Sequence, residues 1–253
     1  MSDEVLVSEN DGILEVTINR PEARNAMTKA AAEAIAAAMD RLDAEAALRC
    51  AILTGAGGTF CSGMDLKGFL KVEIPVAGDR GFGGLTSWTP KKPVIAAVDG
   101  YALAGGMELA IACDLIVANV NAKFGIPEAK RGLVAGGGGV VQLPRLLPRQ
   151  LAMELALTGD PISAQRAFDL GLVNRVTDGP AIDAARELAR AVAANGPLAL
   201  IASKGVIRDS WNWTDEEILP NQATYIGSVF ASQDAIEGAR AFAEKRAPNW
   251  QGK

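Results

Sequence analysis

Short, fully apolar runs between glycine-rich turns constrain the fold of this chain more than any other sequence feature. Residues 50–54 (CAILT) and 94–98 (VIAAV) are apolar at nearly every position instead of alternating between apolar and polar residues. Such runs are typical of strands that are buried on both faces of a sheet. A helix is predicted from about Met107 to Cys113 and a strand over 115–118, and this succession of strand, loop, helix and strand favours a layered α/β domain.

The composition fits one large domain, or a domain with an appendage, built around an aliphatic core. The chain has 253 residues, of which 49% are hydrophobic and 22% charged, as in ordinary globular proteins. Its formal net charge of −5 and its pI near 5.0 argue against a nucleic-acid-binding protein, which needs a basic face. A local basic patch for a phosphorylated small molecule stays compatible with this charge.

Further elements are expected around these strands. A turn over residues 10–12 predicts an N-terminal hairpin, and Thr28 is a typical N-cap for an alanine-rich helix that runs to about Leu42. Residues 55–65 form a glycine-rich loop that lacks P-loop and dinucleotide-binding spacing, so we expect its backbone to approach a ligand closely. Residues 67–89 are irregular in composition, which predicts a long surface segment and a candidate lid.

The C-terminal part of the sequence is helical. A glycine run over 135–139 predicts a tight turn into a short helix, as the alternative to direct ligand binding. A boundary near Gly196 divides the chain into an α/β core over 1–195 and a helical region over 196–253, whose apolar faces and exposed-looking Trp211 and Trp213 predict a subunit interface. Helices are predicted over 150–157, 163–169, 182–194, 197–207, 215–229 and 234–245.

The chain contains no histidine, which excludes Ser-His-Asp and Cys-His catalysis and histidine-ligated zinc. Proton chemistry must then use carboxylates, lysine, tyrosine, cysteine or water. The three cysteines, Cys50, Cys61 and Cys113, form no CxxC pair and are expected to be buried free thiols in a reducing compartment. Residues 1–10 show no secretory signal, and no apolar run reaches the roughly 18 residues of a membrane span. We therefore expect a cytoplasmic protein.

Two glutamates in the apolar stretch over 99–128 are the candidate acid and base. Glu108 lies in MELAIAC, where a carboxylate could instead face solvent or a basic partner. Glu128 follows Pro127, where it could instead be an acid favoured by a helix N-terminus. Backbone N–H groups of the neighbouring glycine-rich loops could stabilise a developing oxyanion. Together these parts suit addition or removal of water next to a carbonyl.

A series of short motifs keeps its order and spacing along nearly the whole chain. They are Asn19-Arg20-Pro21 with Asn25-Ala26, Leu53-Thr54-Gly55, Phe60-Cys61-Ser62-Gly63-Met64-Asp65-Leu66, Pro93-Val94-Ile95-Ala96-Ala97-Val98 with Asp99-Gly100, Ala104-Gly105-Gly106, Cys113-Asp114-Leu115, Phe124-Gly125-Ile126-Pro127-Glu128, Leu157-Thr158-Gly159, residues 167–173, and Phe242-Ala243-Glu244-Lys245-Arg246. With these motifs the chain resembles the crotonase superfamily, and most closely the enoyl-CoA hydratases.

The resemblance implies a ββα spiral core with a C-terminal helical trimerisation region. It implies that the backbone N–H groups of Met64 and Gly105 bind the thioester oxygen, and that Glu108 and Glu128 hold one water between them. Glu108 would help to activate this water, and Glu128 would exchange a proton with the substrate's α-carbon. Because both acids are present, the resemblance favours reversible hydration of a trans-2-enoyl-CoA, as in fatty-acid β-oxidation. The alternatives are an enoyl-CoA isomerase, a specialised acyl-CoA dehydratase, and a catalytically silent acyl-CoA-binding scaffold.

The resemblance also implies where coenzyme A binds. Arg24, Asn25 and Lys67 resemble its nucleotide and pantetheine path, and Phe242 and Lys245 resemble positions that reach CoA in a neighbouring subunit. Surface charge exposed to solvent is the alternative for each basic residue. The implied assembly is a homotrimer or a hexamer of two stacked trimers. Coenzyme A would be part of the substrate, and neither a separate cofactor, nor a metal, nor a nucleic-acid or membrane partner is expected.

Three departures from the common hydratase pattern concern the acyl pocket. Met64 stands where smaller residues are frequent, the glycine run after Val134 replaces a Pro-Gly-Ala-Gly-Gly-Thr form, and residues 67–89 are peculiar to this chain. The resemblance therefore implies an acyl-CoA substrate without specifying its acyl group.

Overall fold

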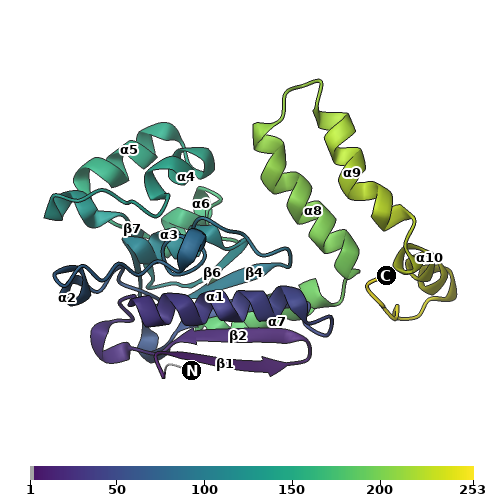
Figure 1. Ribbon diagram of the computed structural model, residues 1–253, viewed down its shortest axis with the longest axis horizontal. Coiled ribbons are helices and arrows are strands. Elements are labelled where there is room, and N and C mark those ends of the chain that lie inside the picture. Colours follow the sequence, from purple (N-terminus) through teal and green to yellow (C-terminus); the bar gives the residue numbers. More distant parts are fainter. Residues whose placement is uncertain (1–2) are drawn as a thin grey trace.

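Two sheets form the centre of the computed structural model, which describes residues 3–253 (Figure 1). In the larger sheet the first two strands are antiparallel and the rest parallel, in the order β1-β2-β3-β4-β6-β9. Its strands are β1 Val5–Asn10, β2 Ile13–Ile18, β3 Cys50–Gly55, β4 Val94–Val98, β6 Leu115–Asn119 and β9 Arg175–Thr177. The smaller sheet pairs β5 Tyr101–Leu103, β7 Lys123–Gly125 and β8 Ile162–Ser163.

Helices follow the strands and then extend alone towards the C-terminus. They are α1 Lys29–Ala44, α2 Leu66–Phe69, α3 Gly105–Ala112, α4 Gly139–Leu146, α5 Arg149–Thr158, α6 Ala164–Asp169, α7 Ala181–Ala193, α8 Pro197–Asp209, α9 Ile218–Phe230 and α10 Gln233–Glu244. The predicted hairpin is confirmed, and so is the Thr28 cap, whose Oγ1 accepts a hydrogen bond from the Ala31 amide at 3.1 Å. None of the helices in residues 3–253 is long and apolar enough to cross a membrane.

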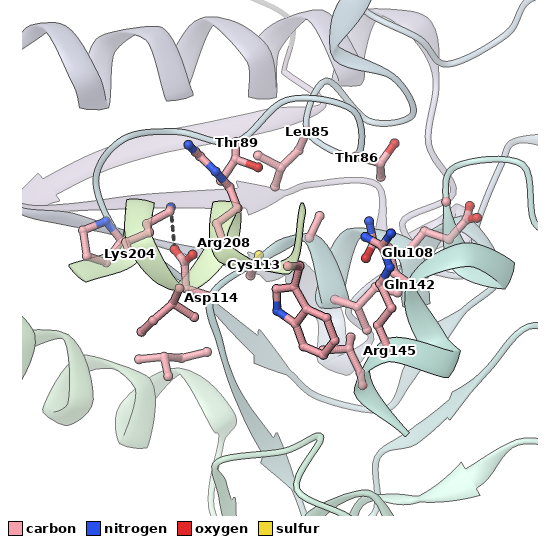
Figure 2. A pocket seen from close by; sticks show the side chains of 18 of the residues that line it. Leu85, Thr86, Thr89, Glu108, Cys113, Asp114, Gln142, Arg145, Lys204 and Arg208 are labelled. Atoms are coloured by element: carbon pink, nitrogen blue, oxygen red, sulfur yellow. Dashed lines mark hydrogen bonds and ion pairs between the residues drawn. The ribbon is translucent and has the colours of Figure 1, made fainter. Parts of the chain in front are cut away.

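The last three helices form an arm that extends away from the sheets in Figure 1. Lys204 of α8 fastens this arm to the core. Its Nζ donates to Asp114 Oδ2 at 2.6 Å (Figure 2), and it also donates to the Lys92 carbonyl at 2.9 Å. Asp114 Oδ2 also accepts the amide of Val94 at 2.7 Å, so one carboxylate joins α8 to strand β4. The division of the chain into domains at residues 195 and 196 stays a prediction.

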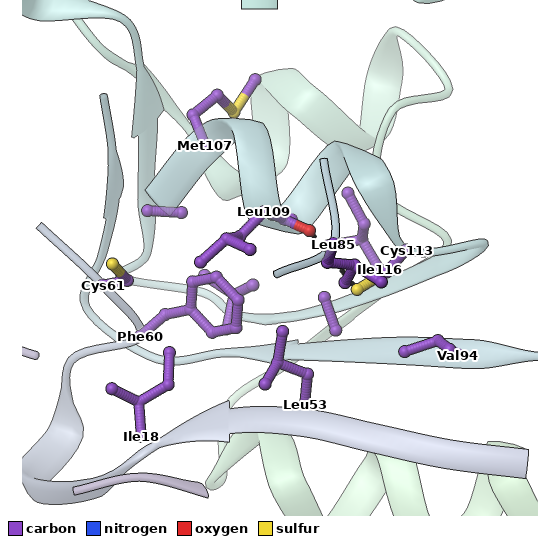
Figure 3. Packing of buried hydrophobic residues seen from close by; sticks show 14 of the residues in the cluster. Ile18, Leu53, Phe60, Cys61, Leu85, Val94, Met107, Leu109, Cys113 and Ile116 are labelled. Atoms are coloured by element: carbon purple, nitrogen blue, oxygen red, sulfur yellow. Dashed lines mark hydrogen bonds between the residues drawn. The ribbon is translucent and has the colours of Figure 1, made fainter. Parts of the chain in front are cut away.

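The apolar core occupies both faces of the larger sheet. On one face, Leu53 of β3 packs with Phe60 and with Leu109 of α3 (Figure 3). On the other, Ile52 and its neighbours pack against the small side chains of α7, which are Ala181, Ala185 and Ala189. Strand β4 and nearly all of β3 are buried between these two layers, which explains their continuous apolar runs. The three cysteines are free and buried, and burial raises the pKa of the Cys50 and Cys61 thiols to about 12.

Residues 67–89 are only partly the surface segment that the composition predicted. Leu70 and Val72 are exposed, but Leu85 is fully buried in the main core, so the prediction is wrong for the second half of the segment. Arg80 fastens this half to the rest of the protein. Its guanidinium stacks on the Trp88 ring at 3.9 Å and pairs with Asp40 of α1. Contacts between residues far apart in sequence therefore hold the segment in place.

The arm attachment leads to a stability prediction. Replacing Lys204 with Met leaves the Asp114 carboxylate, whose pKa burial already raises, without its cationic partner. Because Asp114 is nevertheless exposed to solvent and keeps the hydrogen bond from the Val94 amide, we expect the free energy of unfolding to fall by only about 0.5–1 kcal/mol, as for a solvent-screened ion pair. Denaturant unfolding followed by circular dichroism measures this loss. Lys71→Met, at an exposed lysine, is the matched control, and equal losses in both variants would contradict the attachment.

Candidate active site

The loop after β3 meets the N-terminus of α3, and glycines make their close contact possible. A Cβ at Gly106 would lie 2.0 Å from the Cys61 carbonyl oxygen, so no side chain fits there. Gly63 has a φ of 103°, and a Cβ on it would lie 3.4 Å from the amide nitrogen of Gly105. The Leu103 amide donates to the Cys61 carbonyl at 3.0 Å and holds the two backbones together. Helix α3 therefore begins two residues earlier than the sequence predicts.

This contact leaves two backbone donors side by side. Met27 forms hydrogen bonds with the residues on both sides of Met64. The Met27 amide donates to the Gly63 carbonyl at 2.7 Å, and the Met27 carbonyl accepts the Asp65 amide at 3.0 Å. Neither bond uses the N–H of Met64. Gly105 is the first residue of α3, where an N–H has no partner within the helix. Throughout residues 3–253, neither amide has a protein acceptor. The pair can therefore bind an anionic oxygen.

Glu108 lies in the first turn of α3 and is 3% exposed. The Gly139 amide donates to its Oε1 at 2.8 Å, and the Gly137 amide also stabilises its charge. Burial outweighs these two donors and raises the pKa of the carboxyl group. The alternative that Glu108 faces solvent or a basic side chain is therefore wrong. A Cβ at Gly137 would lie 2.6 Å from Glu108 Oε2, so the carboxylate needs this glycine.

The glycine run thus has a role beyond the tight turn into α4 that the sequence favoured, and this role also differs from the direct ligand binding that was its alternative. Its backbone amides orient a carboxylate. Sequence reasoning missed this function, although the absence of side chains over 136–139 was a usable signal that another group approaches closely.

Glu128 is the second acid, at the start of the 3₁₀ helix Pro127–Arg131. Its Oε2 is buried and has no hydrogen-bond partner among the described residues. Burial raises its pKa to about 7, its own backbone N–H opposes the shift, and the charge of Glu108 contributes to it. Because the Glu108 charge acts on Glu128, the two acids share one neighbourhood. The helix-terminus alternative describes the position of Glu128 correctly but does not account for its buried oxygen.

The predicted CoA contacts do not all lie in one place. Arg24 and Lys67 are exposed: the Arg24 carbonyl accepts the Ser62 amide at 3.1 Å, and Lys67 follows the loop that carries Met64. Phe242 and Lys245 lie at the end of the arm, which Figure 1 places far from α3, so a single chain does not bring them to the site. A role for these two residues in a neighbouring subunit stays a prediction.

Asn25 has a different place. It is fully buried, and its side chain accepts the Arg20 amide at 2.8 Å and donates to the Ala56 and Thr59 carbonyls at 2.8 and 2.5 Å. These bonds use both N–H donors of the amide and one acceptor position of its oxygen, and they brace the loop that leads to Met64. We therefore keep Arg24 and Lys67, and not the Asn25 side chain, as proposed CoA contacts.

A cavity of about 750 Å³ adjoins the site (Figure 2). It lies between α3, α4, the arm and residues 85–89, with Glu108 on one side and Lys204 on the other in this view. Gln142 and Arg145 of α4 line it next to Glu108. The sequence did not predict this space, because its walls come from segments far apart in the chain.

Residues 8–253 match the enoyl-CoA hydratase/isomerase family. The chain belongs to that family, part of the crotonase superfamily. It is 44% identical, over 262 aligned positions and the full length of both chains, to a carnitinyl-CoA dehydratase of Salmonella typhi. A solved enoyl-CoA hydratase of Mycobacterium tuberculosis H37Rv is 55% identical, with a TM-score of 0.97 and complete coverage of both chains. A carnitinyl-CoA hydratase of Mycobacterium avium is 39% identical, with a TM-score of 0.79 over both full chains.

Membership of the enoyl-CoA hydratase/isomerase family confirms the expected crotonase-type α/β fold and a CoA-related enzyme class. Relatives with complete coverage of both chains carry two different activities in their names, hydration and carnitinyl-CoA dehydration. By their names, these relatives therefore include enzymes that add water to an acyl-CoA and enzymes that remove water from one.

The role of Asn25 is testable. We expect Asn25→Ala to lower the free energy of unfolding by about 2–3 kcal/mol, because three buried backbone groups lose their partner. CoA affinity of the folded fraction should change little when it is measured by calorimetry. Asn221→Ala, at a partly exposed asparagine of α9, is the matched control. Lost CoA affinity at unchanged stability would show that Asn25 contacts the ligand instead.

The pKa of Glu128 predicts a pH dependence of stability. Its folded value of about 7 exceeds the ordinary 4.5, so the folded protein holds this proton more tightly than the unfolded chain. The resulting contribution of Glu128 to the free energy of unfolding is fully present below pH 4.5 and is lost as the pH rises through 7. Glu128→Gln should therefore lose less unfolding free energy than the wild type between about pH 5 and about pH 8. Glu154→Gln, at an exposed glutamate, should follow the wild type; parallel curves for all three would contradict the assigned burial.

Proposed function

We propose that the protein catalyses reversible addition of water across the trans-2 double bond of an acyl-CoA thioester. The observation that carries this proposal is that the buried carboxyl group of Glu108 shares a neighbourhood with that of Glu128, which is part-buried and has a buried Oε2, and that the helix of Glu108 begins at the proposed oxyanion donor Gly105. Relatives named enoyl-CoA hydratase support it. A role in fatty-acid β-oxidation is part of the same proposal.

The chemistry uses the two amides and the two acids in separate roles. The Met64 and Gly105 amides bind the thioester oxygen and stabilise the negative charge that develops on it when water attacks the β-carbon. Glu108, fixed by the Gly137 and Gly139 amides, accepts a proton from that water. Glu128 donates a proton to the α-carbon. Its pKa of about 7 suits a group that must both give and take a proton near neutral pH.

No further group is needed for these steps. Coenzyme A enters as part of the substrate, and we propose Arg24 and Lys67 as its contacts on this chain. The arm exposes large apolar side chains, which supports the proposal of a homotrimer or a hexamer. These residues are Ile207, Trp211, Leu219, Phe230, Ile236 and Phe242.

Dehydration of a specialised β-hydroxyacyl-CoA is the second candidate. The 44% identity to a carnitinyl-CoA dehydratase favours it over an isomerase or a silent scaffold. The same residues serve this reaction in reverse: Glu128 removes the α-proton and Glu108 protonates the leaving hydroxyl.

An assay of water addition tests the proposal. We expect turnover of crotonyl-CoA or a longer trans-2-enoyl-CoA, followed by the loss of ultraviolet absorbance of the conjugated thioester. Glu108→Gln and Glu128→Gln should each reduce kcat by about 10²–10⁴-fold, because each removes one proton-transfer group. Glu154→Gln is the control and should keep the wild-type rate. Turnover of carnitinyl-CoA alone would favour the second candidate, and no turnover of any enoyl-CoA would refute hydration.

A further inference from the structure

The Phe82 ring covers the N-terminus of α3. A Cβ at Gly105 would lie 2.2 Å from Phe82 Cζ and 2.4 Å from Cε1, so the ring occupies the space where another residue would place its side chain. The other end of this side chain is close to Gly137. A Cβ on Gly137 would lie 3.1 Å from the Cβ of Phe82 and 2.6 Å from Glu108 Oε2. One side chain therefore extends from the oxyanion donor to the backbone that holds Glu108.

Phe82 is held firmly, although a sequence of this composition predicts a mobile lid. The Gly83 amide donates to the Pro75 carbonyl at 2.9 Å, and the Ser87 amide to the Arg80 carbonyl at 2.9 Å. The Arg80 side chain joins this turn to α1, and the buried Leu85 joins it to the core. The ring itself is only partly exposed and packs against the main core. The Phe82 ring therefore has a fixed position and limits the space next to Gly105.

The cavity reaches Glu108 but not the two amide donors. It is lined by Glu108 and Gly137 and continues past Leu85 to the arm. Neither Met64 nor Gly105 contributes to its lining, and Phe82 is also outside it. The cavity and the thioester site are therefore neighbours that meet at Glu108, with the Phe82 ring against Gly105.

We propose that Phe82 is a specificity-determining residue that restricts the acyl group to short chains by closing the thioester site towards this cavity. The inference rests on the proposed function. An acyl group whose carbonyl oxygen is bound by Met64 and Gly105 meets the ring within a few bonds. Removal of the ring joins the site to about 750 Å³ of space that is partly lined by apolar side chains. Each methylene that a longer chain then buries should gain about fourfold in affinity.

Chain-length profiles test the proposal. We would measure kcat/KM for crotonyl-, hexenoyl-, octenoyl- and decenoyl-CoA with the wild type and with Phe82→Ala. The wild type should prefer the shorter substrates, and the ratio of decenoyl- to crotonyl-CoA should rise at least about tenfold in the variant. Phe82→Trp, with a larger ring, should lower that ratio. Phe168→Ala removes an exposed ring of α6 and should leave it unchanged. An unchanged ratio in Phe82→Ala would overturn the proposal.

A binding measurement separates this inference from the proposed reaction. Calorimetry with butyryl-CoA and decanoyl-CoA, which cannot be hydrated, reports the length of the site without turnover. If Phe82→Ala binds decanoyl-CoA more tightly than the wild type does, but neither protein hydrates any enoyl-CoA, hydration is refuted and the role of Phe82 in limiting chain length is supported. Equal affinity ratios in wild type and variant would refute that role even if hydration is observed. Phe82→Leu, checked for folding by circular dichroism, replaces Phe82→Ala if that variant unfolds, and its ratio should shift in the same direction.

Discussion

The contact between the loop after β3 and the first turn of α3 is the interaction on which the site depends. Gly106 lets the backbone of α3 approach Cys61, and Gly63 lets the loop turn beside Gly105. Both amide donors take their positions from this contact. The central sheet supports it, because β3 precedes the loop and β4 precedes α3. Backbone geometry, held by the core, thus positions the two amides that we propose as donors to the thioester oxygen.

The two acids differ because their surroundings differ. Glu108 is nearly inaccessible but receives backbone hydrogen bonds that favour its ionised form. Glu128 has a buried oxygen without a partner among the described residues and is also close to the charge of Glu108. Its pKa is therefore raised from 4.5 to about 7. A pair of carboxyl groups in unequal environments can divide proton uptake and proton release between them without any histidine.

Much of this arrangement could be predicted from the sequence, for local reasons. Continuous apolar runs indicated the buried strands, Thr28 indicated a helix start, and the motifs around Glu108 and Glu128 indicated the family. Contacts between distant segments could not be predicted. The Arg80–Asp40 pair, the ring of Phe82 on Gly105 and the direction of the arm have no periodic signal. The start of α3 was misplaced because packing against Cys61 overrides the low helix propensity of glycine.

The way in which Glu108 is held has a consequence for how this protein can evolve. Its Oε1 is bound by the main chain of Gly139, so no single neighbouring side chain is responsible for its orientation. Gln142 and Arg145 of the cavity wall can therefore be exchanged while Glu108 keeps its direction. Variation can accumulate on these cavity walls and change the shape of the space beside Glu108. The orientation of the Glu108 carboxylate is protected from that variation as long as the glycines remain.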